Sequence, residues 1–213
     1  MKLLHIDSSI SGGQSVSRQL TASIVARLRE TTPNLEITYR DIVAVPVPLH
    51  SEPIQNGKLK ALSQVTDAPS DRAADLQLQH DFASINTVLN EVLAADIIVL
   101  GAPMYNFAIP GQLKAWVDCL AAPGRTFRYT EQGPEGICGG KRIIVASSRG
   151  GFYTSPSPMA MLDHQESYLT SFFGFIGVSD VKFVRAEGVK YSAEQRQRSL
   201  ESALAEVAVL QAT

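Results

Sequence analysis

The chain has little of several features that mark common classes of protein. Its formal net charge is only −2, with 19 lysines and arginines against 21 acids, so electrostatics favours neither nucleic acid nor an anionic membrane as a partner. No apolar run approaches the roughly 20 residues that a membrane helix needs. The 2 cysteines form no CxxC motif and no disulfide framework. We therefore expect a cytoplasmic protein that binds neither nucleic acid nor membrane.

The motifs of several enzyme classes are also missing. The GxGxxG motif of dinucleotide-binding folds is absent, and so is the GxxxxGK[ST] motif of nucleoside triphosphate sites. There is no HExxH and no cluster of cysteines and histidines, so we expect no metal site. A GxSxG nucleophile elbow is absent as well. Because the chain offers no obvious nucleophile or acid/base dyad, we expect any chemistry to be carried by a bound cofactor.

Apolar strand-like runs alternate with helical patterns along the 213 residues. Most of these runs are continuous and not alternating, as is typical of parallel strands that are covered on both faces. They predict strands over 3–6, 37–40, 97–100, 142–146 and 181–184, with helices over 20–28, 113–120 and 200–207 and a long one near 71–94. This alternation predicts an α/β fold of the flavodoxin-like, doubly wound kind, with a five-stranded parallel sheet and helices on both faces. A single domain over 1–213 is the simplest organisation.

A serine-rich loop, residues 8–17, follows the first predicted strand and opens a helix. Hydroxyl groups and backbone amides at a helix N-terminus favour a phosphate. The hydroxyl groups of this loop are those of Ser8, Ser9, Ser11, Ser15 and Ser17. The loop has no lysine, which suits a monophosphate held by neutral donors. A plain N-cap followed by an ordinary loop remains the alternative, because serine is favoured there anyway.

A second loop, with Met104, Tyr105, Asn106 and Phe107, follows the third predicted strand. In open α/β sheets, ligands bind at the carboxyl edge of the strands. Two aromatic rings around an amide suit a flat heteroaromatic ligand. From this stretch alone, the alternative that Tyr105 and Phe107 fill the core is equally good.

A third loop, with Ser148, Arg149, Gly150 and Gly151, follows the fourth predicted strand. Paired glycines permit close approach of a ligand, although an ordinary turn is the alternative. The three loops follow strands one, three and four, which are neighbours in the flavodoxin-like order. One loop would bind a phosphate, one would flank a ring, and one would meet the polar edge of that ring. This layout fits flavin mononucleotide (FMN).

The chain resembles the FMN-dependent NADH-azoreductases, also described as FMN-dependent NADH:quinone oxidoreductases. The similarity spans essentially the whole length. Six short stretches carry it: 103–107 (PMYNF), 127–131 (FRYTE), 133–136 (GPEG), 148–151 (SRGG), 174–177 (GFIG) and 186–188 (AEG). The combination is specific, although no single stretch is.

The resemblance implies a homodimer with one FMN per active site at the subunit interface. It also implies a role for each loop. Ser9 and 15–17 would bind the phosphate region, 104–107 would contact the isoalloxazine ring, and 148–151 would bind its pyrimidine side. Tyr129 and Phe175 are similar to substrate-pocket positions. Val16 departs from the glutamine that relatives often carry, so its phosphate contact survives only if the backbone amide is the donor.

The resemblance further implies a ping-pong reaction. NADH, or alternatively NADPH, reduces the flavin and leaves, and a flat aromatic acceptor such as a quinone or an azo compound then takes two electrons. Two other functions remain open. A flavodoxin-type electron carrier is disfavoured because such carriers tend to be strongly acidic, and a flavin-binding regulatory module would show little turnover.

Overall fold

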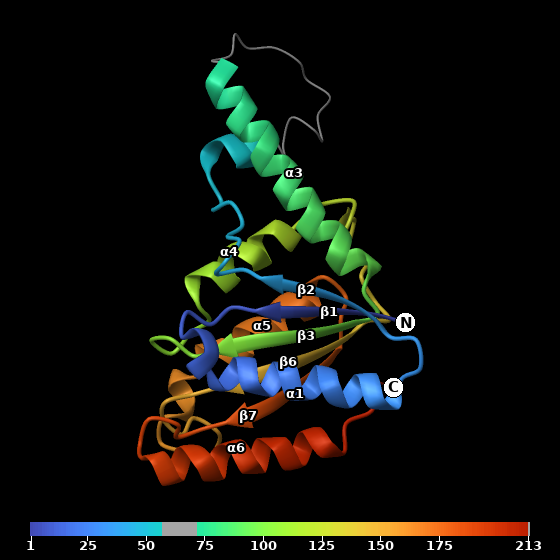
Figure 1. Ribbon diagram of the computed structural model, residues 1–213. Coiled ribbons are helices and arrows are strands. Elements are labelled where there is room, and N and C mark those ends of the chain that lie inside the picture. The colour runs from blue at the N-terminus through green and yellow to red at the C-terminus, as the bar shows by residue number, and fades with distance from the viewer. Residues whose placement is uncertain (57–71, 213) are drawn as a thin grey trace.

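A five-stranded parallel sheet runs through the computed structural model, which describes residues 1–56 and 72–212 (Figure 1). Its strands are β1 (Lys2–Asp7), β2 (Glu36–Asp41), β3 (Ile97–Pro103), β6 (Arg142–Ser148) and β7 (Asp180–Ala186). They lie in the order β2-β1-β3-β6-β7, which is the flavodoxin-like order that the sequence predicts. Each of the five predicted runs lies inside an observed strand, so the predicted fold class is confirmed.

Helices cover both faces of this sheet (Figure 1). On one face lie α1 (Val16–Thr31) and α6 (Ala193–Ala208), and on the other lie α3 (Arg72–Ala94), α4 (Gly111–Leu120) and α5 (His164–Phe175). Successive side chains of a strand point to opposite faces. Ile97 and Val99 of β3 therefore join the core of α1 and α6, whereas Ile98 and Leu100 join the core of the other three helices. Residue 71, at which the predicted long helix starts, lies outside the described residues.

Besides two short 3-10 helices, Gly12–Gln14 and Ala160–Leu162, two larger features of the described residues were not predicted from the sequence. One is α5, and the other is a small antiparallel hairpin of β4 (Phe127–Thr130) and β5 (Gly133–Gly136). The hairpin packs against the end of α5, where a β-carbon at Gly136 would collide with the backbone of Gly177. Among the described residues, no helix combines the length and the apolar character needed to cross a membrane.

Candidate functional site

The three predicted loops lie at the carboxyl ends of β1, β3 and β6, which are adjacent strands. Because the sheet is parallel, these ends meet at one edge. Two contacts join the loops directly. The Met104 amide donates to the Ser148 carbonyl at 2.8 Å, and the Tyr105 hydroxyl lies 3.4 Å from Ser9 Oγ. The structure therefore brings the three groups of predicted site residues together.

The serine loop leaves two backbone donors free at the start of α1. Ser15 is the N-cap, and its Oγ accepts a hydrogen bond from the Arg18 amide at 3.3 Å. The amides of Val16 and Ser17 come before it and donate to no group within residues 1–56 and 72–212. Free amides at a helix N-terminus, together with the helix dipole, attract an anion. The Val16 side chain is buried in the core, so this residue can offer a ligand only its backbone amide.

Arg18 lies beside this loop, but its charge is already paired. Its guanidinium donates to Asp41 Oδ2 at 2.7 Å and to the Ser9 carbonyl at 2.9 and 3.2 Å. The hydrogen bond to Asp41 raises the pKa of Arg18 above its ordinary value. The donors left free in the loop are neutral, as the absence of lysine predicts. Arg18 itself fixes the backbone of Ser9.

The loop after β3 makes a tight turn in an unusual conformation. Tyr105 and Ala108 exchange backbone hydrogen bonds of 2.9 and 3.1 Å. Between them, Asn106 (φ 48°) and Phe107 (φ 71°) both adopt the left-handed region. Asparagine tolerates this conformation, whereas a bulky residue such as phenylalanine is strained there. Strained residues cluster at ligand sites, which favours the ring-binding interpretation over a core-filling one.

Phe107 is held in this conformation from outside the turn. Its carbonyl accepts a hydrogen bond of 3.0 Å from the His164 amide at the start of α5. Its ring meets the ring of Tyr153 edge-on, with centroids 6.2 Å apart. The side chain of Phe107 stays 39% exposed. The ring is therefore positioned by its neighbours and is still accessible to a ligand.

The glycine pair after β6 also leaves backbone donors free. The carbonyls of Gly150 and Gly151 accept hydrogen bonds from the amides of Lys190 (3.2 Å) and Gly188 (2.9 Å). Their own amides donate to no group in the described part of the chain. Two anchored carbonyls beside two free amides form a suitable donor pair for the polar edge of a planar ring.

Arg149, in contrast, is turned into the protein. Its amide donates to the Ala186 carbonyl and its own carbonyl accepts from the Val189 amide, at 2.9 and 3.0 Å. Its side chain is only 1% exposed. The guanidinium pairs with three carboxylates, those of Asp163, Glu166 and Glu187. Arg149 can therefore brace the loop, but its charge is not presented to a ligand.

The two predicted substrate-pocket residues lie on the elements that the sequence did not reveal. Tyr129 is on β4 and is 74% exposed, whereas Phe175 ends α5 and is 38% exposed. Phe127 joins them, with ring centroids 5.4 Å from Tyr129 and 4.7 Å from Phe175. Phe127 was missed as a member of this group because only the hairpin brings it between the other two rings.

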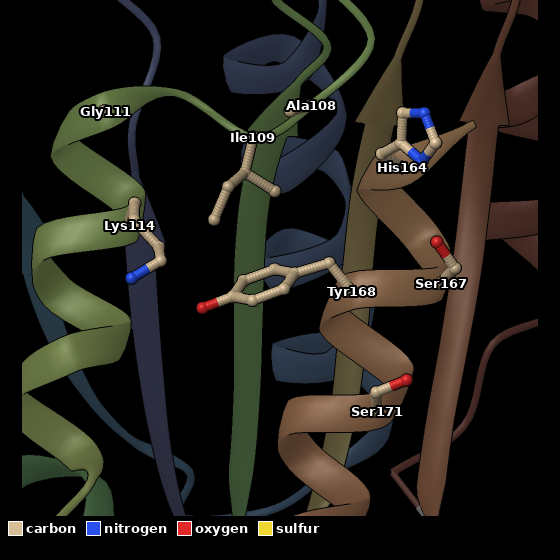
Figure 2. Close-up of a pocket in the computed structure, with 8 residues that line it drawn as sticks. All are labelled: Ala108, Ile109, Gly111, Lys114, His164, Ser167, Tyr168 and Ser171. Atoms are coloured by element: carbon tan, nitrogen blue, oxygen red, sulfur yellow. The ribbon is translucent and has the colours of Figure 1, made fainter. Parts of the chain in front are cut away.

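A cavity of about 710 Å³ lies between α4 and α5, and sequence reasoning did not find it (Figure 2). The Tyr168 ring and the Lys114 amine point into the same space, with Ile109 above them. Burial raises the pKa of Tyr168 to about 12, so this hydroxyl stays protonated at neutral pH. The lining residues are Ala108, Ile109, Gly111, Lys114, His164, Ser167, Tyr168 and Ser171. None of them is a predicted site residue, although Ala108 directly follows Phe107.

Comparison with known sequences gives consistent matches over the full length. A family model described as a flavodoxin-like fold matches residues 1–210. The chain is 50% identical over 212 residues to the FMN-dependent NADH:quinone oxidoreductase of Bradyrhizobium sp. (strain BTAi1), with 100% of both chains covered. It is 52% identical over 208 residues to FMN-dependent NADH:quinone oxidoreductase 2 of Xanthomonas euvesicatoria pv. vesicatoria (strain 85-10), covering 98% of this chain and 92% of that one.

Solved structures match as well. An azoreductase from Bacillus anthracis str. Sterne is 29% identical and superposes with a TM-score of 0.87, covering 98% of this chain and 97% of that chain. An FMN-dependent NADH-azoreductase from Bacillus anthracis str. Ames Ancestor, solved in complex with FMN, is 25% identical with a TM-score of 0.84. That match covers 97% of this chain and 95% of the other.

Proposed function

The chain belongs to the flavodoxin-like family of FMN-dependent NADH:quinone oxidoreductases, and we propose that it transfers two electrons from NADH, through bound FMN, to quinones and aromatic azo compounds. Relatives that are about 50% identical over nearly the full length are named as quinone oxidoreductases. The azo activity is in the name of a structure that superposes over nearly the whole chain.

The residues at the carboxyl edge of the sheet fit FMN in three respects. The free amides of Val16 and Ser17, with the hydroxyls of Ser9, Ser15 and Ser17, would hold the phosphate. The turn 104–107 would lie against the isoalloxazine ring. Gly150 and Gly151 would donate to the pyrimidine edge, with Ser148 and Arg149 holding their loop in place. The observation that carries this proposal is a strained aromatic turn with free backbone donors on both sides of it.

The chemistry that FMN supplies when bound is acceptance of a hydride from NADH and delivery of two electrons to the acceptor. The chain supplies orientation. The turn at Asn106 and Phe107 would form one side of the site for the flavin ring. The loop 148–151 would position the backbone amides that donate to the edge of that ring. Tyr129 and Phe175, whose rings pack on the buried ring of Phe127 and stay partly exposed, offer apolar contacts to a quinone or azo compound. Holding the acceptor in a defined orientation would lower the entropic part of the barrier.

We further propose a homodimer in the cytoplasm. Phe107, beside the start of α5, and Tyr129 and Phe175, at its other end, have exposed rings. A second copy could cover these rings and bring Tyr129 and Phe175 beside the FMN site of the first. Cys119 and Cys138 are buried and form no disulfide, which is usual in a reducing compartment. Light scattering on the purified protein tests the dimer directly, and a monomeric mass would contradict it.

A visible spectrum with added FMN separates the enzyme from its alternatives. The proposal expects FMN to bind, NADH to bleach the flavin absorbance without oxygen, and a quinone to restore it. A protein that binds FMN but is not bleached by NADH would be an electron carrier or a regulatory module. A protein that binds no FMN would contradict the proposed function.

A further inference from the structure

The Gln165 side chain joins the ends of the two strands that carry the ring-binding loops. It is fully buried, near the start of α5. Its Nε2 donates to the Ala102 carbonyl at 2.7 Å, and its Oε1 lies 3.0 Å from Ser147 Oγ. Ala102 and Ser147 are paired in register across β3 and β6. The side chain therefore contacts both strands directly before the turn 104–107 and the loop 148–151.

The orientation of this amide follows from its partners. A carbonyl can only accept, so the nitrogen of Gln165 must face Ala102. Ser147 Oγ already accepts a hydrogen bond of 3.0 Å from Arg149 Nε, so its own proton is free to be donated to Oε1. Every polar atom of the amide that faces a strand thus has a partner of the right kind, which is what a buried polar network requires.

The residues on either side of Gln165 hold the same two loops. The His164 amide donates to the Phe107 carbonyl, and the Glu166 carboxylate pairs with Arg149. Asp163 caps this turn of helix by accepting from the amides of Gln165 and Glu166 at 3.0 and 3.1 Å. Three consecutive residues at the start of α5 therefore contact the loop at Phe107, the ends of β3 and β6, and Arg149.

We propose that Gln165 is a positioning residue that fixes the separation of the two ring-binding loops and thereby sets the affinity for the flavin ring and its reduction potential. This inference rests on the proposed function, because it concerns the same site. Gln165 lies behind the loops and needs no contact with the ligand. A change at Gln165 would alter the binding of the flavin ring and not the binding of the phosphate, for which Val16 and Ser17 of the serine-rich loop are proposed.

Comparison of FMN with riboflavin separates the two parts, because riboflavin lacks the phosphate. We expect Gln165→Leu to weaken binding of both ligands by a similar factor of at least tenfold and to shift the midpoint potential of the bound flavin. Both are measured on the purified protein, by fluorescence quenching during titration and by a redox titration. The matched control is Lys141→Met. Lys141 Nζ donates to the carbonyls of Leu93 and Ala95 at 2.8 and 2.7 Å, which is a comparable bridge at the opposite end of the sheet.

A second variant, Gln165→Glu, tests the hydrogen bonds themselves. A protonated carboxyl can donate to Ala102 and accept from Ser147 as the amide does, whereas an ionised carboxylate cannot donate. We expect riboflavin affinity near that of the wild type at low pH and a loss as pH rises through the pKa of the new carboxyl. Other charged or titratable groups lie around this position and are the same in both proteins. Measuring the wild-type affinity at each pH therefore corrects for their titration. They are Arg149, Arg185, Asp163, His164 and Glu166.

The inference is overturned if Gln165→Leu keeps the riboflavin affinity and the midpoint potential of the wild type, even where it melts at a lower temperature, as we expect for Lys141→Met. If Gln165→Leu does not fold, Gln165→Glu decides: the inference is overturned by a riboflavin affinity that still tracks the wild type at a pH where the new carboxyl is shown to be ionised by infrared spectroscopy. Failure of the wild type to bind FMN would instead contradict the proposed function, so the two failures are distinguishable.

Discussion

The hydroxyl oxygens of Ser9 and Tyr105 lie 3.4 Å apart, although 96 residues separate them in the chain. The Tyr105 oxygen also accepts a hydrogen bond of 3.3 Å from the Ile10 amide. Ser9 belongs to the proposed phosphate loop and Tyr105 to the proposed ring-binding turn. This contact therefore sets the spacing between the sites for the two ends of the cofactor.

Removal of this hydroxyl should loosen the spacing. Tyr105→Phe deletes the contact to Ser9 and the acceptor for Ile10, and one lost hydrogen bond corresponds to about 1 kcal/mol. We expect the dissociation constant for FMN to rise about fivefold, as measured by fluorescence titration. Tyr191→Phe is the control, since the Tyr191 hydroxyl has no hydrogen bond within the described residues and the ring only packs on Phe152. Equal affinities in the two variants would contradict this role of Tyr105.

A proline at position 16 tests the backbone amide as a phosphate donor. Val16 is the first residue of α1, where proline is well tolerated, and Ser15 has φ −72° and ψ 125°, which suits a residue before proline. Val16→Pro therefore removes the donor and keeps the helix. We expect FMN binding to weaken by about 1.5 to 3 kcal/mol, the range for a hydrogen bond to a charged group, with riboflavin binding unchanged.

Val16→Ala is the partner experiment, because it keeps the amide and removes the buried side chain. It should lower the free energy of unfolding by about 1 to 2 kcal/mol and leave FMN affinity nearly unchanged. If the alanine and proline variants bind FMN equally well, the amide is not a phosphate contact.

Asn106 can act through its side chain or through its backbone. We expect Asn106→Ala to weaken flavin binding or to slow reduction by NADH, measured by titration and by anaerobic stopped-flow mixing. Because φ at this position is 48°, alanine also adds strain. Asn106→Gly removes the same side chain without that strain. A glycine variant with wild-type binding and reduction would show that the side chain has no role of its own.

The pairing of Asp41 with Arg18 predicts a specific pH dependence of stability. The hydrogen bond from Arg18 lowers the pKa of Asp41 below its ordinary value, which is about 3.9 in an unfolded chain. A carboxyl whose pKa is lower in the folded state stabilises the fold above the unfolded value, and this stabilisation disappears as pH falls through the folded value. Asp41→Asn should therefore lower the free energy of unfolding at neutral pH, with the difference closing at acidic pH below about 4.

Urea denaturation of both proteins across this pH range provides the measurement. Asp180→Asn is the control, since Asp180 is largely exposed and lies 3.5 Å from Arg142, a pair that should contribute little. A difference between wild type and Asp41→Asn that stays constant down to the lowest pH would contradict the assignment.

The centre of the sheet was predictable because β1, β3 and β6 are largely buried and their sequences are nearly continuous apolar runs. The run 97–100 is the clearest, and all of β3 is buried. The loops could be placed for the same reason, since each follows such a run. The contacts that these loops make could not be predicted from the sequence. That Val16 offers only its amide, and that Arg149 points into the protein, depends on packing partners from distant parts of the chain.

Helix α5 was missed because its apolar stripe begins with a polar residue. Its buried residues are Gln165, Leu169 and Phe173, spaced four apart on one face. Gln165 interrupts the pattern that periodicity detects, and it does so because it binds two strand ends. The Asp163 cap two residues earlier was the available signal. The hairpin was missed because the segment 133–136 is rich in glycine and proline, which are depleted in strands.

The most direct test of the account follows the two half-reactions of the FMN-loaded protein without oxygen. One equivalent of NADH should bleach the flavin absorbance completely, and one equivalent of a quinone added afterwards should restore it at a rate that supports steady-state turnover. A flavin that NADH leaves oxidised, or a reduced flavin that the quinone does not reoxidise, would contradict the central claim.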